Sequence, residues 1–149
     1  MRALIQRVTS GKVTVKNKVL REIGLVFVIL LGVKEGDGEK EVEVLAEKTV
    51  NLRVMSDEND KMNKSILDVN GAILVVSQFT LYADTSAGRR PSFINAAKPD
   101  VAKELYQYFV DKLKQSGVKN VQTGEFGAYM SVEIVNDGPV TILLDTEEL

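Results

Sequence analysis

Three hydrogen-bonding side chains fall within four residues in the stretch SQFTL, where Ser77, Gln78 and Thr80 flank Phe79. These residues stand at the end of the stretch AILVVSQFTL, whose composition is typical of a strand buried on both faces. Because ligands of α/β sheets tend to meet the carboxyl ends of strands, this polar end is a candidate site. Strand alternation predicts Ser77 and Phe79 on one side and Gln78 and Thr80 on the other. The commoner alternative is a strand that becomes polar where it reaches solvent.

The composition limits the chemistry that such a site can use. The 149 residues contain no His and no Cys, which excludes Ser-His-Asp and Cys-His catalysis, thiolate zinc sites and disulfides. A base must therefore come from Asp, Glu, Lys or the substrate. We interpret the cluster of Asp57, Glu58 and Asp60 as a solvated loop. No P-loop, Rossmann or EF-hand pattern occurs, and we expect no cofactor and no metal.

Positive charge gathers in GRRPSF, where Arg89 and Arg90 are adjacent in a loop bounded by Gly and Pro. Paired guanidinium groups suit phosphate contacts, although a solvated loop is the commoner explanation. Lys98, Arg2 and Arg7 carry further positive charge that the sequence does not bring together. The net charge is −2 and the isoelectric point about 5.3. Any RNA partner must therefore be held by a local pocket or patch, because proteins that coat nucleic acid are usually basic.

FGAYM is a second stretch that suits a binding site. Gly124 and Gly127 permit close approach of the backbone, and Met130 supplies an adaptable apolar wall. Ordinary core and turn structure is the alternative, and we expect Tyr129 to belong to the core.

The stretch NDGPVT, residues 136–141, contains strong turn chemistry and predicts a loop between strands. Pro139 then runs directly into a strand, where its missing N–H is a handicap. A rigid Gly138-Pro139 backbone that is presented to a ligand is the alternative interpretation.

The hydrophobic pattern predicts the elements that position these residues. Turns are expected at Ser10-Gly11 and at residues 16–18, and a polar connection at residues 55–71. We expect strands at 2–8, 12–15, 19–23, 24–33 and 72–81, helices at 39–53 and from Pro99 to Gly117, and from residue 118 further strands that TGEFG and NDGP interrupt.

Both helices show apolar stripes at helical spacing. Asp37 is the predicted cap of the first helix, and Pro99 suits the first turn of the second. The expected inward faces are Val42, Leu45, Thr49 and Leu52 in the first helix, and Val101, Leu105, Tyr108, Phe109 and Leu113 in the second.

This order of elements predicts an α/β fold with a mixed sheet, as a single domain over residues 1–149. Two helices cannot cover both faces of so many strands, so we expect a layered α/β/β arrangement with the two main helices outside. The longest apolar run, residues 24–33, is too short to span a membrane and too far along the chain for a signal peptide. We expect a cytoplasmic protein without a membrane partner.

Several stretches together resemble one family, the D-aminoacyl-tRNA deacylases. They are MRALIQRV, NLRV, KMNKS, VVSQFTLYAD, GRRPSF, AAKPDVAKELY, FGAYM and NDGPVT, in the family's order and spacing from Met1 to about Asp145. SQFTL and NDGPVT are the specific signatures and lie about sixty residues apart. SGKVTVKNKV and TILLD differ from typical family forms, but both lie outside the expected contacts.

The resemblance implies a homodimer that hydrolyses the ester between a D-amino acid and the 3′-terminal adenosine of tRNA, a proofreading step of translation. It implies that Ser77, Gln78, Phe79 and Thr80 form the pocket floor. The partner subunit's Gly138 and Pro139, in the cis form, then point their carbonyls into that pocket. The remaining expected roles belong to Ala102 and Met130, near the adenosine or aminoacyl group, and to Arg7, which holds the Gly-Pro loop.

Under this resemblance, chirality is tested by exclusion, because an L side chain strikes the carbonyls and a D side chain points away. Glycyl-tRNA, with no side chain to reject, is also an expected substrate. Main-chain N–H groups near Phe79 and Thr80 are candidate oxyanion donors, and the ribose 2′-hydroxyl is the favoured activator of water. Thr80 as nucleophile is the alternative, which needs an adjacent base. The rival function is a non-catalytic nucleic-acid-binding module that uses Arg89, Arg90 and Lys98.

Overall fold

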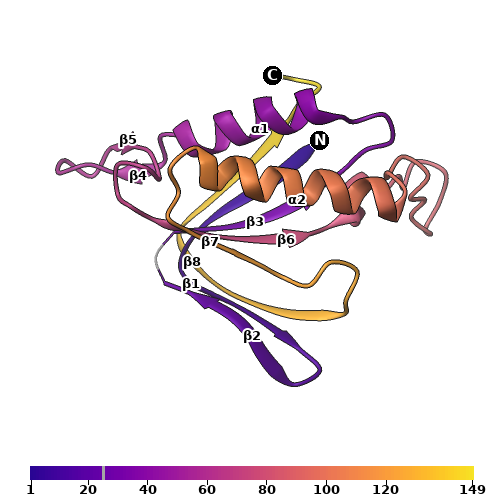
Figure 1. The fold of residues 1–149 in the computed structure, drawn as a ribbon, viewed down its shortest axis with the longest axis horizontal. Helices are drawn as coiled ribbons and strands as arrows, with labels where there is room; N and C mark the ends of the chain where they lie inside the picture. Colours follow the sequence, from indigo (N-terminus) through magenta and orange to yellow (C-terminus); the bar gives the residue numbers. More distant parts are fainter. Residues whose placement is uncertain (25) are drawn as a thin grey trace.

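The computed structural model describes residues 1–24 and 26–149, so Leu25 of the predicted strand 24–33 lies outside the described residues. Within that part of the chain, a six-stranded sheet carries two helices on one face, and a short hairpin and a 3-10 helix complete the fold (Figure 1). The elements are β1 Arg2–Val15, β2 Lys18–Ile23, β3 Val26–Gly32, α1 Glu39–Asn51, β4 Met55–Ser56, β5 Met62–Lys64, β6 Ala72–Ser77, the 3-10 helix η1 Phe79–Tyr82, α2 Pro99–Gln115, β7 Asn120–Thr123 and β8 Met130–Asp145.

The sheet is mixed, as predicted. Its order is β2-β1-β3-β6-β7, with β8 paired to β1. The pairs β3–β6 and β6–β7 are parallel, and the pairs of β1 with β2, β3 and β8 are antiparallel. Strands β3 and β6 are buried on both faces, which explains their unbroken apolar sequences.

Alternate residues of the central strands feed two separate cores. Phe27, Ile29 and Ile73 pack under the helices, in the larger core that also contains Leu45 and Phe109. Side chains on the other face of the same strands pack against the far half of the sheet, in a second core of Val8, Val13, Ile23, Val28, Leu74 and Val76. The predicted α/β/β layering is therefore confirmed, and its two β layers are parts of one curved sheet (Figure 1).

The predicted turn at Ser10-Gly11 is wrong, because β1 runs without a break from Arg2 to Val15. The strand pairs with β3 as far as Val8 and with β2 from Gly11 onward, so it passes from one layer to the other between these residues. Gly11 is buried, and a Cβ atom there would lie 2.6 Å from Cγ2 of Val28. The glycine marks close packing of the two layers and not a turn.

The start of α1 also differs from the prediction. Gly38 is the N-cap, and its N–H donates to Oε2 of Glu41 at 2.9 Å. Asp37 instead accepts hydrogen bonds from the α-amino group of Met1 at 2.9 Å and from the N–H of Lys34 at 2.6 Å. Its carboxylate therefore joins the start of β1 to the end of β3. Val42, Leu45 and Thr49 of the predicted inward face are buried, whereas Leu52 is the half-buried C-cap just beyond the helix.

In α2, Pro99 occupies the first turn as predicted. The predicted burial of Val101 is wrong, because this side chain is 45% exposed. Tyr106, which the predicted stripe omitted, is buried beside Leu105 and Phe109. The inward stripe follows 102, 106, 109 and 113, and one turn before Tyr106 it reaches the half-buried Ala102. No helix in the described part of the chain is long and apolar enough to span a membrane.

We predict that Gly11→Ala lowers the free energy of unfolding by about 1–3 kcal/mol, because the added methyl group overpacks the contact between the layers. Urea denaturation at one fixed protein concentration measures the change.

Val28→Ala provides the matched test of the cause. Because it removes the methyl group that the added Cβ at position 11 would meet, the double variant should be less destabilised than the sum of the two single variants. Strict additivity in this double-mutant cycle would contradict the proposed contact.

Candidate active site

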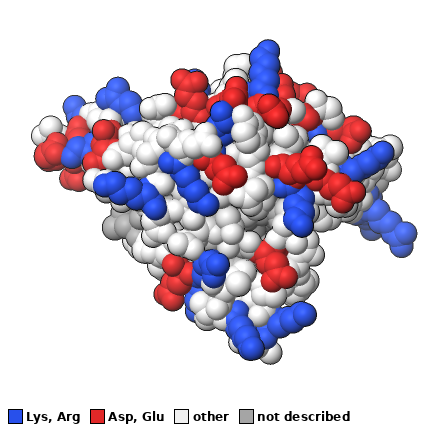
Figure 2. Space-filling view, in the orientation of Figure 1, with Lys and Arg blue, Asp and Glu red and all other residues white. Residues whose placement is uncertain are grey.

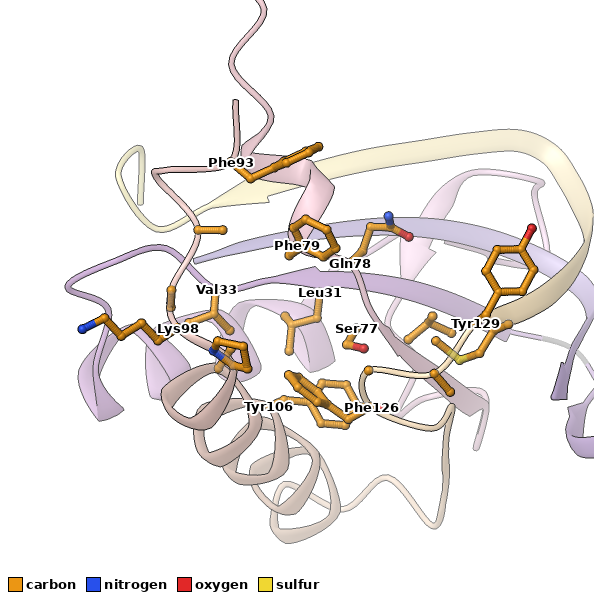
Figure 3. A pocket seen from close by; sticks show the side chains of 18 of the residues that line it. Leu31, Val33, Ser77, Gln78, Phe79, Phe93, Lys98, Tyr106, Phe126 and Tyr129 are labelled. Atoms are coloured by element: carbon orange, nitrogen blue, oxygen red, sulfur yellow. The ribbon is translucent and has the colours of Figure 1, made fainter. Parts of the chain in front are cut away.

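A cavity of about 640 Å³ opens at the carboxyl end of β6, where the sequence predicted a site (Figure 3). Its lining comes from the ends of β3 and β6, from the start of η1, and from the loop 93–98 and the first two turns of α2. The turn between β7 and β8 and the start of β8 complete it. Of the predicted site residues, the structure brings Ser77, Gln78, Phe79, Ala102 and Met130 together around it.

The chain leaves the strand conformation at the floor of the cavity. Strand β6 ends at Ser77, and the N–H of Gln78 still donates to the carbonyl of Leu31 at 2.8 Å. Gln78 then has φ −145° and ψ 79°, and η1 begins at Phe79. The predicted alternation through SQFT is therefore wrong. Ser77, Gln78 and Phe79 all line the cavity, because the backbone turns there instead of continuing as a strand.

Thr80 occupies a different position from its three neighbours. It is exposed, and it is absent from the described lining of the cavity. Its hydroxyl accepts a hydrogen bond from the side-chain amide of Gln78. Because an amide is no base, this contact does not activate Thr80 as a nucleophile.

The start of η1 offers main-chain donors. The first N–H groups of a helix have no partner within it, and here they belong to Phe79 and Thr80. These are the two groups that the sequence analysis proposed as oxyanion donors.

The cavity walls are largely aromatic and apolar. The rings of Phe79 and Phe93 meet edge to face, with centroids 4.9 Å apart. The rings of Tyr106 and Phe126 lie 5.7 Å apart on the opposite side of the floor (Figure 3). The hydroxyl of Tyr106 donates to the carbonyl of Val75 at 2.8 Å, and burial raises the pKa of this phenol. Tyr106 is thus a neutral structural donor and not a candidate base.

Charge is sparse at the cavity. Among the lining residues that the structure describes, Lys98 is the one charged side chain, and no carboxylate lines the cavity. The described residues also contain no cluster of three or more potential metal ligands. Of the side-chain types that the sequence analysis left open as a base, the described lining therefore contains Lys98 alone.

Arg89 and Arg90 lie apart from the cavity lining, on an exposed loop as predicted. The base of this loop is closed by two backbone hydrogen bonds of 2.8 Å between Asp84 and Ser92. On the helical face of the molecule, acidic and basic side chains are interspersed (Figure 2). A phosphate contact at this loop would therefore be local.

NDGPVT forms a bulge inside a strand, and the predicted break there is wrong. Strand β8 continues through it, but Gln6 pairs with Thr141 and Val8 pairs with Asn136. One residue of β1 thus faces the four residues 137–140, which interrupt the described pairing of the two strands as a bulge. Gly138 and Pro139 are exposed, and the peptide bond between them is cis. Neither residue lines the described cavity of its own chain.

Arg7 is the residue of β1 that faces the bulge, and its side chain is only 11% exposed. Its Nε atom lies 3.2 Å from the carbonyl oxygen and 3.1 Å from Oδ2 of Asp137. Its Nη1 atom donates to the carbonyl of Val54 at 2.7 Å. At Gly138, with φ +125°, an added Cβ would lie 3.2 Å from Nη2 of Arg7. The guanidinium group therefore fixes the bulge against the sheet.

Sequence reasoning missed several residues of the site. Tyr129 was expected in the core, but it is 97% exposed at the rim of the cavity. Phe93, Tyr106 and Phe126 line the cavity and were not singled out. The available signal was that Phe93 and Phe126 stand within the stretches GRRPSF and FGAYM, which were recognised for other residues.

Comparison with known proteins gives a consistent result. The family model described as D-Tyr-tRNA(Tyr) deacylase matches residues 4–145. A D-aminoacyl-tRNA deacylase of Thermosipho africanus is 53% identical over 149 residues, covering 100% of this chain and 99% of that protein. One of a Roseiflexus species is 56% identical over 146 residues, covering 98% of this chain and 94% of that protein.

Two solved structures share the fold. A protein named c-Myc DNA Unwinding Element Binding Protein has a TM-score of 0.92 at 41% identity, covering 97% of this chain and 98% of its own. A probable eukaryotic D-amino acid tRNA deacylase has a TM-score of 0.80 at 17% identity, covering 96% of this chain and 97% of its own. The family match spans nearly the whole sequence, and the chain therefore belongs to the D-Tyr-tRNA(Tyr) deacylase family.

Proposed function

We propose that this protein hydrolyses the ester of D-aminoacyl-tRNA, and of glycyl-tRNA, to release the amino acid and tRNA. The observation that carries the proposal is the cavity at the end of β6, which brings Ser77, Gln78 and Phe79 together with Ala102 and Met130. The family resemblance assigns Ser77, Gln78 and Phe79 to the pocket floor. It places Ala102 and Met130 near the adenosine or aminoacyl group. We place the reaction in the cytoplasm, where translation supplies the substrate.

In this proposal, the cavity holds the aminoacyl group and the terminal adenosine. Water attacks the ester carbonyl carbon, and the N–H groups of Phe79 and Thr80 stabilise the oxyanion. The bond to the ribose 3′-oxygen then breaks, and that oxygen takes up the proton that the attacking water loses, so that it leaves as a hydroxyl group. The 2′-hydroxyl helps to activate the water. The sparse charge of the described lining, with Lys98 alone, supports this division of labour.

Selection against L substrates is assigned to a second copy of the chain. In the proposed homodimer, the partner subunit's Gly138 and Pro139 point their carbonyls into the cavity. The exposure of this bulge and its absence from the described cavity of its own chain support the assignment. The bulge projects from β8, whose side chains Val135 and Leu143 are each about half exposed. Such a strand is suited to cover by another subunit.

A second candidate function is nucleic-acid binding without catalysis. It is favoured by the likeness to the c-Myc DNA Unwinding Element Binding Protein. It would use the exposed Arg89 and Arg90 for phosphate contacts, a role that we also assign to them in the deacylase. Binding of this kind is salt-sensitive, indifferent to the aminoacyl group and without product release.

The primary prediction concerns substrate chirality. Purified protein in EDTA should release D-tyrosine from D-tyrosyl-tRNA and glycine from glycyl-tRNA, and should leave L-tyrosyl-tRNA at its spontaneous rate of hydrolysis. Release of labelled amino acid over time is the measurement. Equal release of D- and L-tyrosine would refute selection against L substrates by the Gly-Pro bulge. Release of neither would favour nucleic-acid binding without catalysis. Inert glycyl-tRNA beside a reactive D substrate would contradict selection by exclusion.

The second prediction separates the substrate hydroxyl from Thr80. A D-aminoacyl-tRNA that ends in 2′-deoxyadenosine should react roughly 100-fold more slowly, because it lacks the group that activates water. Thr80→Ala should lower kcat/KM by less than about tenfold, the effect of one lost neutral hydrogen bond.

Single-turnover hydrolysis measures both effects, and unchanged circular dichroism controls for folding of the variant. Normal turnover of the deoxy substrate together with an inactive Thr80→Ala enzyme would instead establish the nucleophile mechanism.

The third prediction tests the anchor of the bulge. Arg7→Lys should reduce the ratio of D to L hydrolysis by about tenfold or more, because a lysine cannot replace the contacts with both Asp137 and Val54. Asp137→Asn, which keeps the main-chain acceptor, should have a smaller effect in the same direction.

Lys12→Ala is the matched control for this series. It removes another ion pair between β1 and β8, that of Lys12 with Glu133, away from the bulge. The ratio of D to L hydrolysis in Lys12→Ala should equal that of the wild type. A wild-type ratio in Arg7→Lys would show that Arg7 does not position the selecting loop.

A further inference from the structure

Tyr129 combines two properties that rarely occur together. It lines the mouth of the cavity, yet its side chain is 97% exposed. Figure 3 shows its ring at the side of the cavity opposite Lys98. The next residue, Met130, also lines the cavity. In the single chain, the face of this ring at the edge of a candidate active site is open to contact with part of a substrate.

The backbone on both sides of this ring is held firmly. At one end of the turn between β7 and β8, the N–H of Gly124 donates to the carbonyl of Val75 at 2.9 Å. At the other end, Met130 begins β8 and pairs with Val15. Contact between the two ends is so close that a Cβ at Gly124 would lie 2.7 Å from the sulfur of Met130. The turn therefore presents Tyr129 from a defined position.

We propose that Tyr129 is a stacking platform for the base of the nucleotide that precedes the terminal adenosine of tRNA. The inference rests on the proposed function. A cavity of about 640 Å³ has the size of a site for one small molecule, here the aminoacyl adenosine. The single-stranded acceptor end must leave that cavity across its rim, where the exposed ring stands.

Stacking also suits the charge of this protein. The net charge is −2, and Lys98 is the one charged side chain in the described lining. Attraction for the RNA backbone at the mouth is therefore limited. Aromatic rings bind successive bases of single strands through their faces, and this stacking tolerates any sequence because every base has a π-face.

The test is the affinity for a tRNA that carries a non-hydrolysable amide-linked D-tyrosine. Fluorescence anisotropy gives the dissociation constant for wild type, Tyr129→Ala, Tyr129→Phe and Tyr129→Trp. The alanine variant should bind about tenfold more weakly, whereas the two aromatic variants should stay near the wild-type value.

A second RNA, abasic at the penultimate nucleotide, identifies the group that is stacked. Wild type should bind it as weakly as Tyr129→Ala binds the intact RNA, and Tyr129→Ala should bind both RNAs equally. A wild-type affinity of Tyr129→Ala for the intact RNA would overturn the proposal. It would also be overturned if Tyr129→Ala lowered the affinity for the abasic RNA as much as it lowers the affinity for the intact RNA.

Controls separate stacking from assembly and from catalysis. Tyr108→Ala removes a half-buried ring on α2 outside the described cavity lining and should leave the affinity unchanged. A change of native mass in Tyr129→Ala would place the ring in a subunit interface and overturn the proposal. Release of D-tyrosine from the ester-linked tRNA by wild type is scored separately. Stacking without that release would refute the proposed function alone.

Discussion

The passage of β1 from one layer of the sheet to the other is the constraint on which the structure depends. The strand pairs with β3 as far as Val8 and with β2 from Gly11, while β8 accompanies it along its whole length. This single strand therefore contributes to both cores, with Ile5 under the helices and Val13 between the layers. Close approach of the layers at the crossing requires a residue without a side chain, and Gly11 meets that need.

The bulge of NDGPVT lies next to this crossing along β1. Where β1 changes partners, its register with β8 shifts twice, around Arg7 and around Thr9. The shift at Arg7 leaves residues 137–140 outside the regular pairing, and the largely covered guanidinium group of Arg7 contacts them through Asp137. A β-bulge of this kind is a feature of strand pairing, so its position is fixed by the sheet and not by the flexibility of a loop. The crossing and the bulge are thus neighbouring features of the same pair of strands, β1 and β8.

Local patterns in the sequence predicted the elements that carry strong periodicity. The apolar strands β3 and β6, the inward face of α1 and the proline at the start of α2 are found as expected. The errors at Ser10-Gly11 and at NDGP share a cause, because turn-forming residues also suit layer contacts and bulges, and only distant partners such as Val28 and Arg7 decide between them. The prediction for Tyr129 failed for a similar reason. Aromatic residues are usually buried, and no local signal in the sequence marks a ring at the mouth of a cavity.

In the proposed enzyme, the cavity floor and the Gly138-Pro139 bulge that selects against L substrates belong to different subunits. The cavity floor is built from β6 and η1, and Gly138 and Pro139 of the same chain take no part in its described lining. In the proposed homodimer, each cavity is therefore completed by the other subunit. A monomer would have the cavity floor without the Gly-Pro bulge that excludes L substrates. An aminoacyl ester is already activated, so weak catalytic groups at the floor suffice. Discrimination can then reside in rigid backbone that excludes the wrong enantiomer, and the absence of His and Cys from the sequence is no handicap to such a site.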